Sequence, residues 1–226
     1  RSARKKSSAA SDVYKRQQES GVNVLTPELK VSDGALTELL IHQAPWVIDG
    51  QPTPSLRPHR LAVGLYSLQD DKLVRTELIH LDVSQAVTSV PLPPQTPKPD
   101  LVLVNDTDLT YAKVRFDDAS LSTALAHLSG LDDSLAQLLV LSTVWDMVRD
   151  AEIPLEKYIE LLEANIDAVT HSTGLTVQLR QLATAVESYT EPQNRSALSA
   201  RIADFLWDAT LRSPAPVSYT HLRAHE

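Results

Sequence analysis

The chain contains one pair of histidines whose spacing could hold a metal ion. His221 and His225 form H-x-x-x-H within HLRAH, and on a helix this i, i+4 spacing would direct both imidazoles at one zinc ion. Zinc peptidases that use this spacing also need a glutamate directly after the first histidine to activate water, and Leu222 occupies that position. We therefore interpret the spacing as a coincidence.

The other histidines are scattered and show no ligand spacing. We expect each to be a surface residue or a locally hydrogen-bonded one; they are His42, His59, His80, His127 and His171. The chain has no cysteine, which excludes disulfides and thiolate chemistry and is compatible with a reducing compartment. None of the six glycines forms a phosphate-binding G-x-G-x-x-G or P-loop motif.

A charged cluster lies near the end of an expected helix. Asp146, Arg149, Asp150 and Glu152 could act as acid and base groups toward a substrate. The same spacing also suits a solvated helix face with i, i+3 and i, i+4 pairs, and we favour this interpretation.

A second polar cluster, Asn105, Asp106 and Asp108, could suggest a calcium loop. It lacks the glycine at the sixth position and the glutamate at the twelfth that an EF-hand needs, so we predict a turn. The sequence therefore predicts no catalytic, cofactor-binding or metal-binding residue in this chain.

The elements that would carry these residues fall into two unlike halves. Short apolar runs separated by turn signals cover residues 36–43, 60–68, 73–83 and 86–90. Leu61, Val63 and Leu65 can share one face, as can Ile79, Leu81 and Val83. The prolines of residues 91–99 predict an extended connection before a last hairpin, with strands at 100–105 and 110–116. We expect an antiparallel β-sandwich over residues 18–117.

From Asp118 onward the apolar period is helical. We predict helices over residues 120–131, 135–147, 154–166, 177–189 and 195–211, with Asp132 or Asp133 as a cap and Pro154 at a first helical position. Gly174 is expected to interrupt the pattern. Short connections favour antiparallel neighbours, so residues 118–213 predict an incomplete HEAT-like helical solenoid.

Both ends differ from the rest of the chain. Residues 1–17 and 217–226 resemble translated sequencing-adapter sequence, and we leave them out of the fold. The formal net charge is -8, and the remainder is more acidic still because residues 1–17 contain six basic residues and one aspartate. Such a body disfavours nucleic acid and anionic membranes as partners. We find neither a transmembrane-length apolar run nor a secretory signal, and expect a cytoplasmic protein.

Several segments resemble one known family in wording as well as pattern. They are DLVLVNDTDLTYAKVRFD at residues 100–117, and the segments at 21–31, 56–68, 72–83, 144–166 and 179–192. In this order they resemble the C-terminal part of the bacterial-type aminopeptidase N family, the zinc gluzincin peptidases. There a small β-sandwich precedes a C-terminal helical domain.

This resemblance implies that the chemistry lies elsewhere in a parent protein. The family's H-E-x-x-H zinc motif and G-x-M-E-N substrate loop are absent from residues 21–212. The implied partners are an upstream catalytic domain that holds zinc, and peptide substrates; the chain itself would be inactive and would shape and gate the cleft. Two alternatives stay open: a stand-alone scaffold that binds a protein or peptide, and a non-catalytic paralogue that regulates a full-length enzyme.

Overall fold

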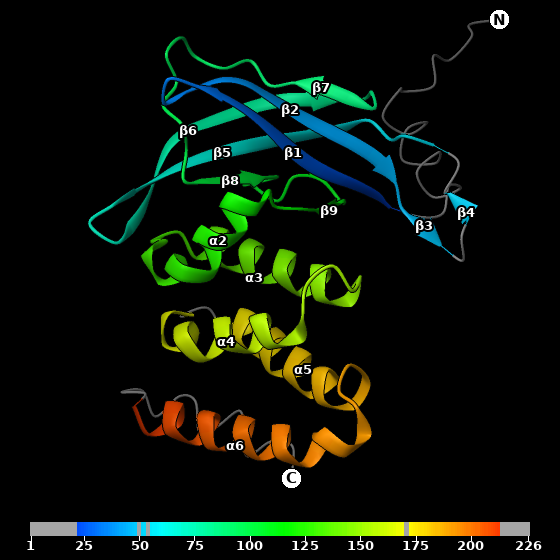
Figure 1. Ribbon diagram of the computed structural model, residues 1–226, viewed down its shortest axis with the longest axis vertical. Helices are drawn as coiled ribbons and strands as arrows, with labels where there is room; N and C mark the ends of the chain where they lie inside the picture. The colour runs from blue at the N-terminus through cyan, green and yellow to red at the C-terminus, as the bar shows by residue number, and fades with distance from the viewer. Residues whose placement is uncertain (1–21, 49–50, 53–54, 170–171, 213–226) are drawn as a thin grey trace, which may run out of the picture.

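The computed structural model describes residues 22–48, 51–52, 55–169 and 172–212. The two adapter-like ends, His171 and the pair His221 and His225 lie outside these residues. Figure 1 shows two β-sheets at one end of the molecule and a stack of helices beneath them. The order of sheets followed by helices confirms the predicted β-then-α class.

The first sheet has the strand order β7-β2-β1-β9. Strands β1 (Asn23–Ser32) and β2 (Ala35–Pro45) form an antiparallel hairpin, and β7 (Val87–Ser89) pairs with β2. The turn between β1 and β2 places Asp33 and Gly34 at positive φ, a conformation that glycine adopts without strain. Strand β9 (Lys113–Val114) runs parallel to β1.

The second sheet has the order β6-β5-β8 and contains β5 (His59–Gln69), β6 (Lys72–Val83) and β8 (Leu101–Val104). A two-stranded ribbon, β3 (Val47–Ile48) and β4 (Gln51–Pro52), lies beside the sheets. The predicted inward sets of β5 and β6 are confirmed, because both belong to one buried cluster with Leu25, Leu39 and Ile41 of the first sheet.

The predicted last hairpin is wrong. Strand β8 pairs with β5 in one sheet, whereas β9 pairs with β1 in the other. The turn between them was predicted correctly: Asn105 and Asp108 adopt positive φ, and the Asn105 side chain accepts the N–H groups of Leu109 and Thr110. The local pattern showed two strands and a turn, but pairing was decided by distant partners.

Strands β5 and β8 are buried on both faces. Val102 and Val104 contact the sandwich core, whereas Leu101 and Leu103 belong to the core of the helices. Tyr66 of β5 also belongs to the helical core, while its neighbour Leu65 belongs to the sandwich core. The second sheet is therefore shared between two hydrophobic cores.

The helical part contains α2 (Asp118–His127), α3 (Ser134–Arg149), α4 (Leu155–Asn165), α5 (Ser172–Ser188) and α6 (Arg195–Arg212), with 3-10 turns at Leu128–Gly130, Ile166–Ala168 and Pro192–Asn194. The predicted cap is Asp133, whose carboxylate accepts the N–H of Leu135. In the described part of the chain, no helix has the length and apolar character needed to cross a membrane.

Two helix boundaries differ from the prediction. Pro154 is the N-cap of α4 rather than its first helical residue. Gly174 lies inside α5 and does not interrupt it, because its missing side chain lets α5 approach Leu138 of α3: a Cβ at Gly174 would overlap the Leu138 side chain.

The end of α3 carries an unusual alanine. Ala151 adopts φ 60°, its N–H donates to the carbonyl of Val148, and the N–H of Glu152 donates to the carbonyl of Met147. This is a Schellman motif, in which glycine is preferred because it lacks the Cβ that strains the left-handed conformation.

Replacing Ala151 by glycine is therefore expected to stabilise the chain by about 0.5–1 kcal/mol, as measured by urea unfolding. The matched control is Ala203→Gly on the exposed face of α6, which should cost about 1 kcal/mol through lost helix propensity. Equal destabilisation by both substitutions would contradict the assignment of strain to Ala151.

Candidate functional site

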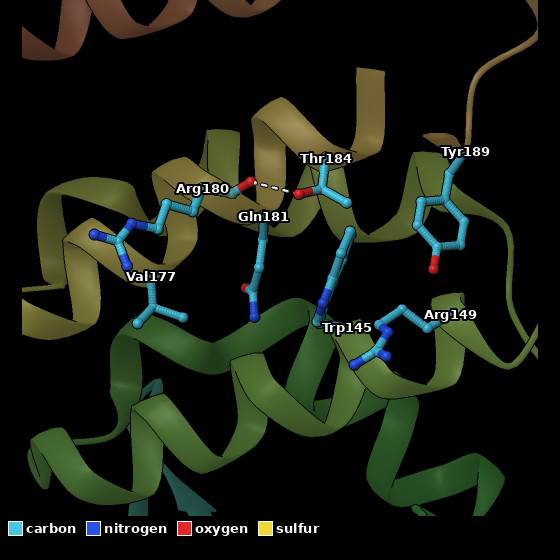
Figure 2. Close-up of a pocket in the computed structure, with 7 residues that line it drawn as sticks. All are labelled: Trp145, Arg149, Val177, Arg180, Gln181, Thr184 and Tyr189. Carbon is cyan, nitrogen blue, oxygen red and sulfur yellow. Dashed lines mark hydrogen bonds between the residues drawn. The ribbon is translucent and has the colours of Figure 1, made fainter. Parts of the chain in front are cut away.

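A groove runs between α3 and α5 on the helical part of the molecule. It has a volume of about 430 Å³ and is lined by residues of both helices and by the residue that follows α5: Trp145, Arg149, Val177, Arg180, Gln181, Thr184 and Tyr189 (Figure 2). A second hollow of about 520 Å³ shares Tyr189 and continues along the loop from Val148 to Leu155. Together they form a candidate binding surface, which we call the α3–α5 groove.

Aromatic rings form the floor of this groove. The ring centroid of Trp145 lies 5.6 Å from that of Tyr189 in an edge-on arrangement and 5.0 Å from that of the buried Tyr158. The Tyr158 hydroxyl donates to Oε1 of Gln178 and Gln181, 2.7 Å away in each case. Burial raises the pKa of Tyr158, so it stays protonated and holds the Gln181 side chain in place.

Two arginines give the groove a positive charge. Arg149 lies 3.5 Å from Asp146, an exposed i, i+3 pair that contributes little energy. No described carboxylate lies within ion-pairing distance of Arg180. In an acidic chain, this groove suits a ligand that combines a carboxylate with an apolar or aromatic group.

The charged cluster after α3 is only partly the solvated face that we predicted. Arg149 is exposed and forms the predicted i, i+3 pair with the half-buried Asp146. Asp150 is different: its side chain is 7% exposed and accepts from Lys113 Nζ at 2.6 Å and from Arg115 Nη2. Arg115 also pairs with Glu152, with 2.6 Å between Nε and Oε2. We call Lys113, Arg115, Asp150 and Glu152 the C-terminal ion cluster, because they gather at the C-terminal end of α3.

The prediction failed for Asp150, which is buried, whereas Glu152 is exposed as predicted; the partners of both are distant in sequence. Lys113 lies in β9 and Arg115 directly follows this strand, and nothing in the spacing of residues 146–152 shows that β9 lies against the end of α3. Lys113 also lies over the Trp46 ring, 3.7 Å from its centroid, which further reduces its contact with water.

The turn at 105–108 holds a structural carboxylate and shows no calcium-binding arrangement. The Asp106 side chain is fully buried, accepts from the Tyr66 hydroxyl at 2.8 Å and lies 2.8 Å from Arg75 Nε. Arg75 also donates to Asp133 at 2.7 Å. Burial raises the pKa of Asp106 and that of Tyr66, while the hydrogen bond from Arg75 lowers the pKa of Asp133 against the opposing effect of partial burial. We call Arg75, Asp106 and Asp133 the N-terminal ion cluster, because Asp133 is at the N-terminal end of α3.

The described histidines lie apart from one another. His59 is buried with Nδ1 2.6 Å from the Thr110 hydroxyl, His42 pairs with Glu28, His127 lies 3.9 Å from Asp71, and His80 is exposed. Within the described ranges, no three His, Asp or Glu side chains gather closely enough to hold a metal ion. These residues do not fit a zinc site, so we assign no step of zinc chemistry to them.

The fold is a β-sandwich followed by a stack of helices, with the α3–α5 groove as its candidate binding surface. The family described as "ERAP1-like C-terminal domain" matches residues 101–222. Aminopeptidase N of Streptomyces lividans is 38% identical over 211 residues, which cover 91% of this chain and 23% of that protein. The chain belongs to the ERAP1-like C-terminal domain family, and its resemblance to the C-terminal part of an aminopeptidase N is confirmed.

Proposed function

We propose that this chain is the non-catalytic C-terminal portion of a cytoplasmic zinc aminopeptidase, which removes N-terminal residues from peptides. Its helices, stacked as part of a HEAT-like solenoid, shape and gate the cleft of an upstream catalytic domain that holds the zinc. The family membership supports this, as does the fact that the chain spans 23% of the length of the relative that it matches.

The observation that carries the proposal is the chemistry of the α3–α5 groove. Its aromatic floor of Trp145 and Tyr189 suits an apolar peptide side chain, and Arg180 suits a peptide carboxylate. The residues that line the hollow between α3 and α5 include no histidine or carboxylate that could hold zinc or activate water, as the reaction would need. The groove can therefore contact part of a peptide that is remote from the bond to be cleaved.

A chimeric enzyme tests this role. Residues 22–212 replace the matching segment of the Streptomyces lividans aminopeptidase N, and we expect hydrolysis of a short aminoacyl reporter to persist. Arg180→Gln in the chimera is expected to raise the KM for peptides that reach the groove about tenfold or more, the effect of one charge-assisted hydrogen bond, without changing reporter hydrolysis.

The control is Arg60→Gln, because Arg60 is exposed on the sandwich and remote from the groove. This substitution should change hydrolysis of neither the peptide nor the reporter. If Arg180→Gln reduced hydrolysis of the peptide and of the reporter equally, this would contradict a role of Arg180 in peptide binding.

A second candidate function is a stand-alone scaffold that binds a protein or peptide. It is favoured by the same positively charged groove together with the lack of a metal-binding cluster among the described residues. The gene sequence upstream of residue 21 separates the two: an in-frame H-E-x-x-H motif supports the peptidase, and a native start site near residue 21 supports the scaffold.

A further inference from the structure

Helix α3 is held to the sandwich at both of its ends, by residues of different sheets. Its N-cap Asp133 contacts Arg75 of β6, in the second sheet. Its C-cap Asp150 contacts Lys113 of β9, in the first sheet. One helix therefore spans both sheets beneath the sandwich (Figure 1).

The N-terminal ion cluster is anchored inside the protein. Arg75 donates to Asp106 as well as to Asp133, and the Asp106 side chain is 0% exposed. Arg75 Nε also donates to the Tyr66 hydroxyl at 2.9 Å. Because these groups hold one another through several hydrogen bonds, the position of the guanidinium group relative to the second sheet is fixed.

The C-terminal ion cluster is desolvated at its centre, whereas in the N-terminal ion cluster only Asp106 is fully buried, since Arg75 and Asp133 are 30% and 43% exposed. The side chains of Arg115 and Asp150 are 6% and 7% exposed, so their attraction is not weakened by water as it is at the Arg60–Asp82 pair, where both side chains are 69% exposed. Separating Arg115 from Asp150 would break an ion pair between two buried side chains and leave each with one remaining partner, Glu152 for Arg115 and Lys113 for Asp150, which is unfavourable.

Between these two clusters the hydrophobic core is continuous. Leu101 and Leu103 of β8 and Tyr66 of β5 share one buried cluster with Val144 of α3 and Leu162 of α4. The 3-10 turn after α2 also meets the hairpin of β5 and β6 closely, since a Cβ on Gly130 would overlap the carbonyl oxygen of Asp71. A rotation of the helices relative to the sandwich would have to expose apolar surface and break both ion clusters.

We propose that the sandwich and helices α2 to α4 move as one rigid body, with no hinge between β8 and α2. If the chain gates a cleft as proposed above, opening and closing then carry both parts together. Rigidity of the unit itself does not depend on that function.

Paired spin labels test this directly. The chain has no cysteine, so Ser89→Cys on β7 and Ala164→Cys on α4, both exposed, supply the only two labelling sites. We expect a single narrow distance distribution by double electron–electron resonance. Adding Asp133→Asn and Asp150→Asn should broaden the distribution or produce a second population, whereas the surface control Asp82→Asn should leave it unchanged.

A broad or two-peaked distribution in the chain with intact ion clusters would overturn the proposal, and it does so even if the doubly substituted chain fails to fold. An unchanged narrow distribution after both substitutions would overturn the assignment of rigidity to the ion clusters. Neither result involves peptide or catalysis, so the outcome is distinct from that of the chimeric enzyme.

Discussion

Replacing Asp150 by alanine is expected to destabilise the chain by about 3–5 kcal/mol, the usual cost of removing one partner from a buried ion pair. The substitution leaves Arg115, 6% exposed, and Lys113, 16% exposed, without the carboxylate that both contact. Urea unfolding, followed by tryptophan fluorescence, measures the free energy of unfolding.

The control for this experiment is Asp82→Ala, which removes a carboxylate from an exposed pair and should cost less than about 1 kcal/mol. If Asp150→Ala cost no more than the control, the C-terminal ion cluster would contribute no more to stability than an exposed ion pair.

Gly64→Ala is expected to destabilise the chain by about 3 kcal/mol or more, in the range of severe overpacking. A Cβ on Gly64 would overlap Oδ2 of Asp106, and would lie 2.7 Å from its Cγ and 2.8 Å from the Tyr66 ring. Neither neighbour can move away freely, because Asp106 is held by Tyr66 and Arg75.

A double-mutant cycle supplies the control for Gly64→Ala. In the Asp106→Ala background the overlapping carboxylate is gone, so the added methyl group should cost less than in the parent chain. Equal costs in the two backgrounds would show that Asp106 is not the group that requires glycine at position 64.

The order of elements could be predicted from the sequence because each signal is local. The cap at Asp133, the left-handed turn at Asn105 and the alternation of Leu61, Val63 and Leu65 all depend on residues near them in the chain. Gly174 was misread for a different reason: the requirement for glycine comes from Leu138 on another helix.

The site could not be predicted because its parts converge only in three dimensions. Trp145 and Arg180 are far apart in sequence and belong to no motif, and the groove between them exists because α5 packs against α3. Asp150 likewise gains its partners from β9, and β8 and β9 separate into different sheets through pairing with β5 and β1. Such long-range choices leave no periodic signature in the chain.

The alternation of β8 between two cores limits how this region can be exchanged between relatives. Leu101 and Leu103 complement one set of neighbours, and Val102 and Val104 complement another, over only four successive residues. A recombination event between β8 and α2 would join the second sheet of one relative to the helices of another. Those helices would be adapted to a sheet face with different side chains. We therefore expect sandwich and helices to be inherited as a pair, with crossovers tolerated outside them.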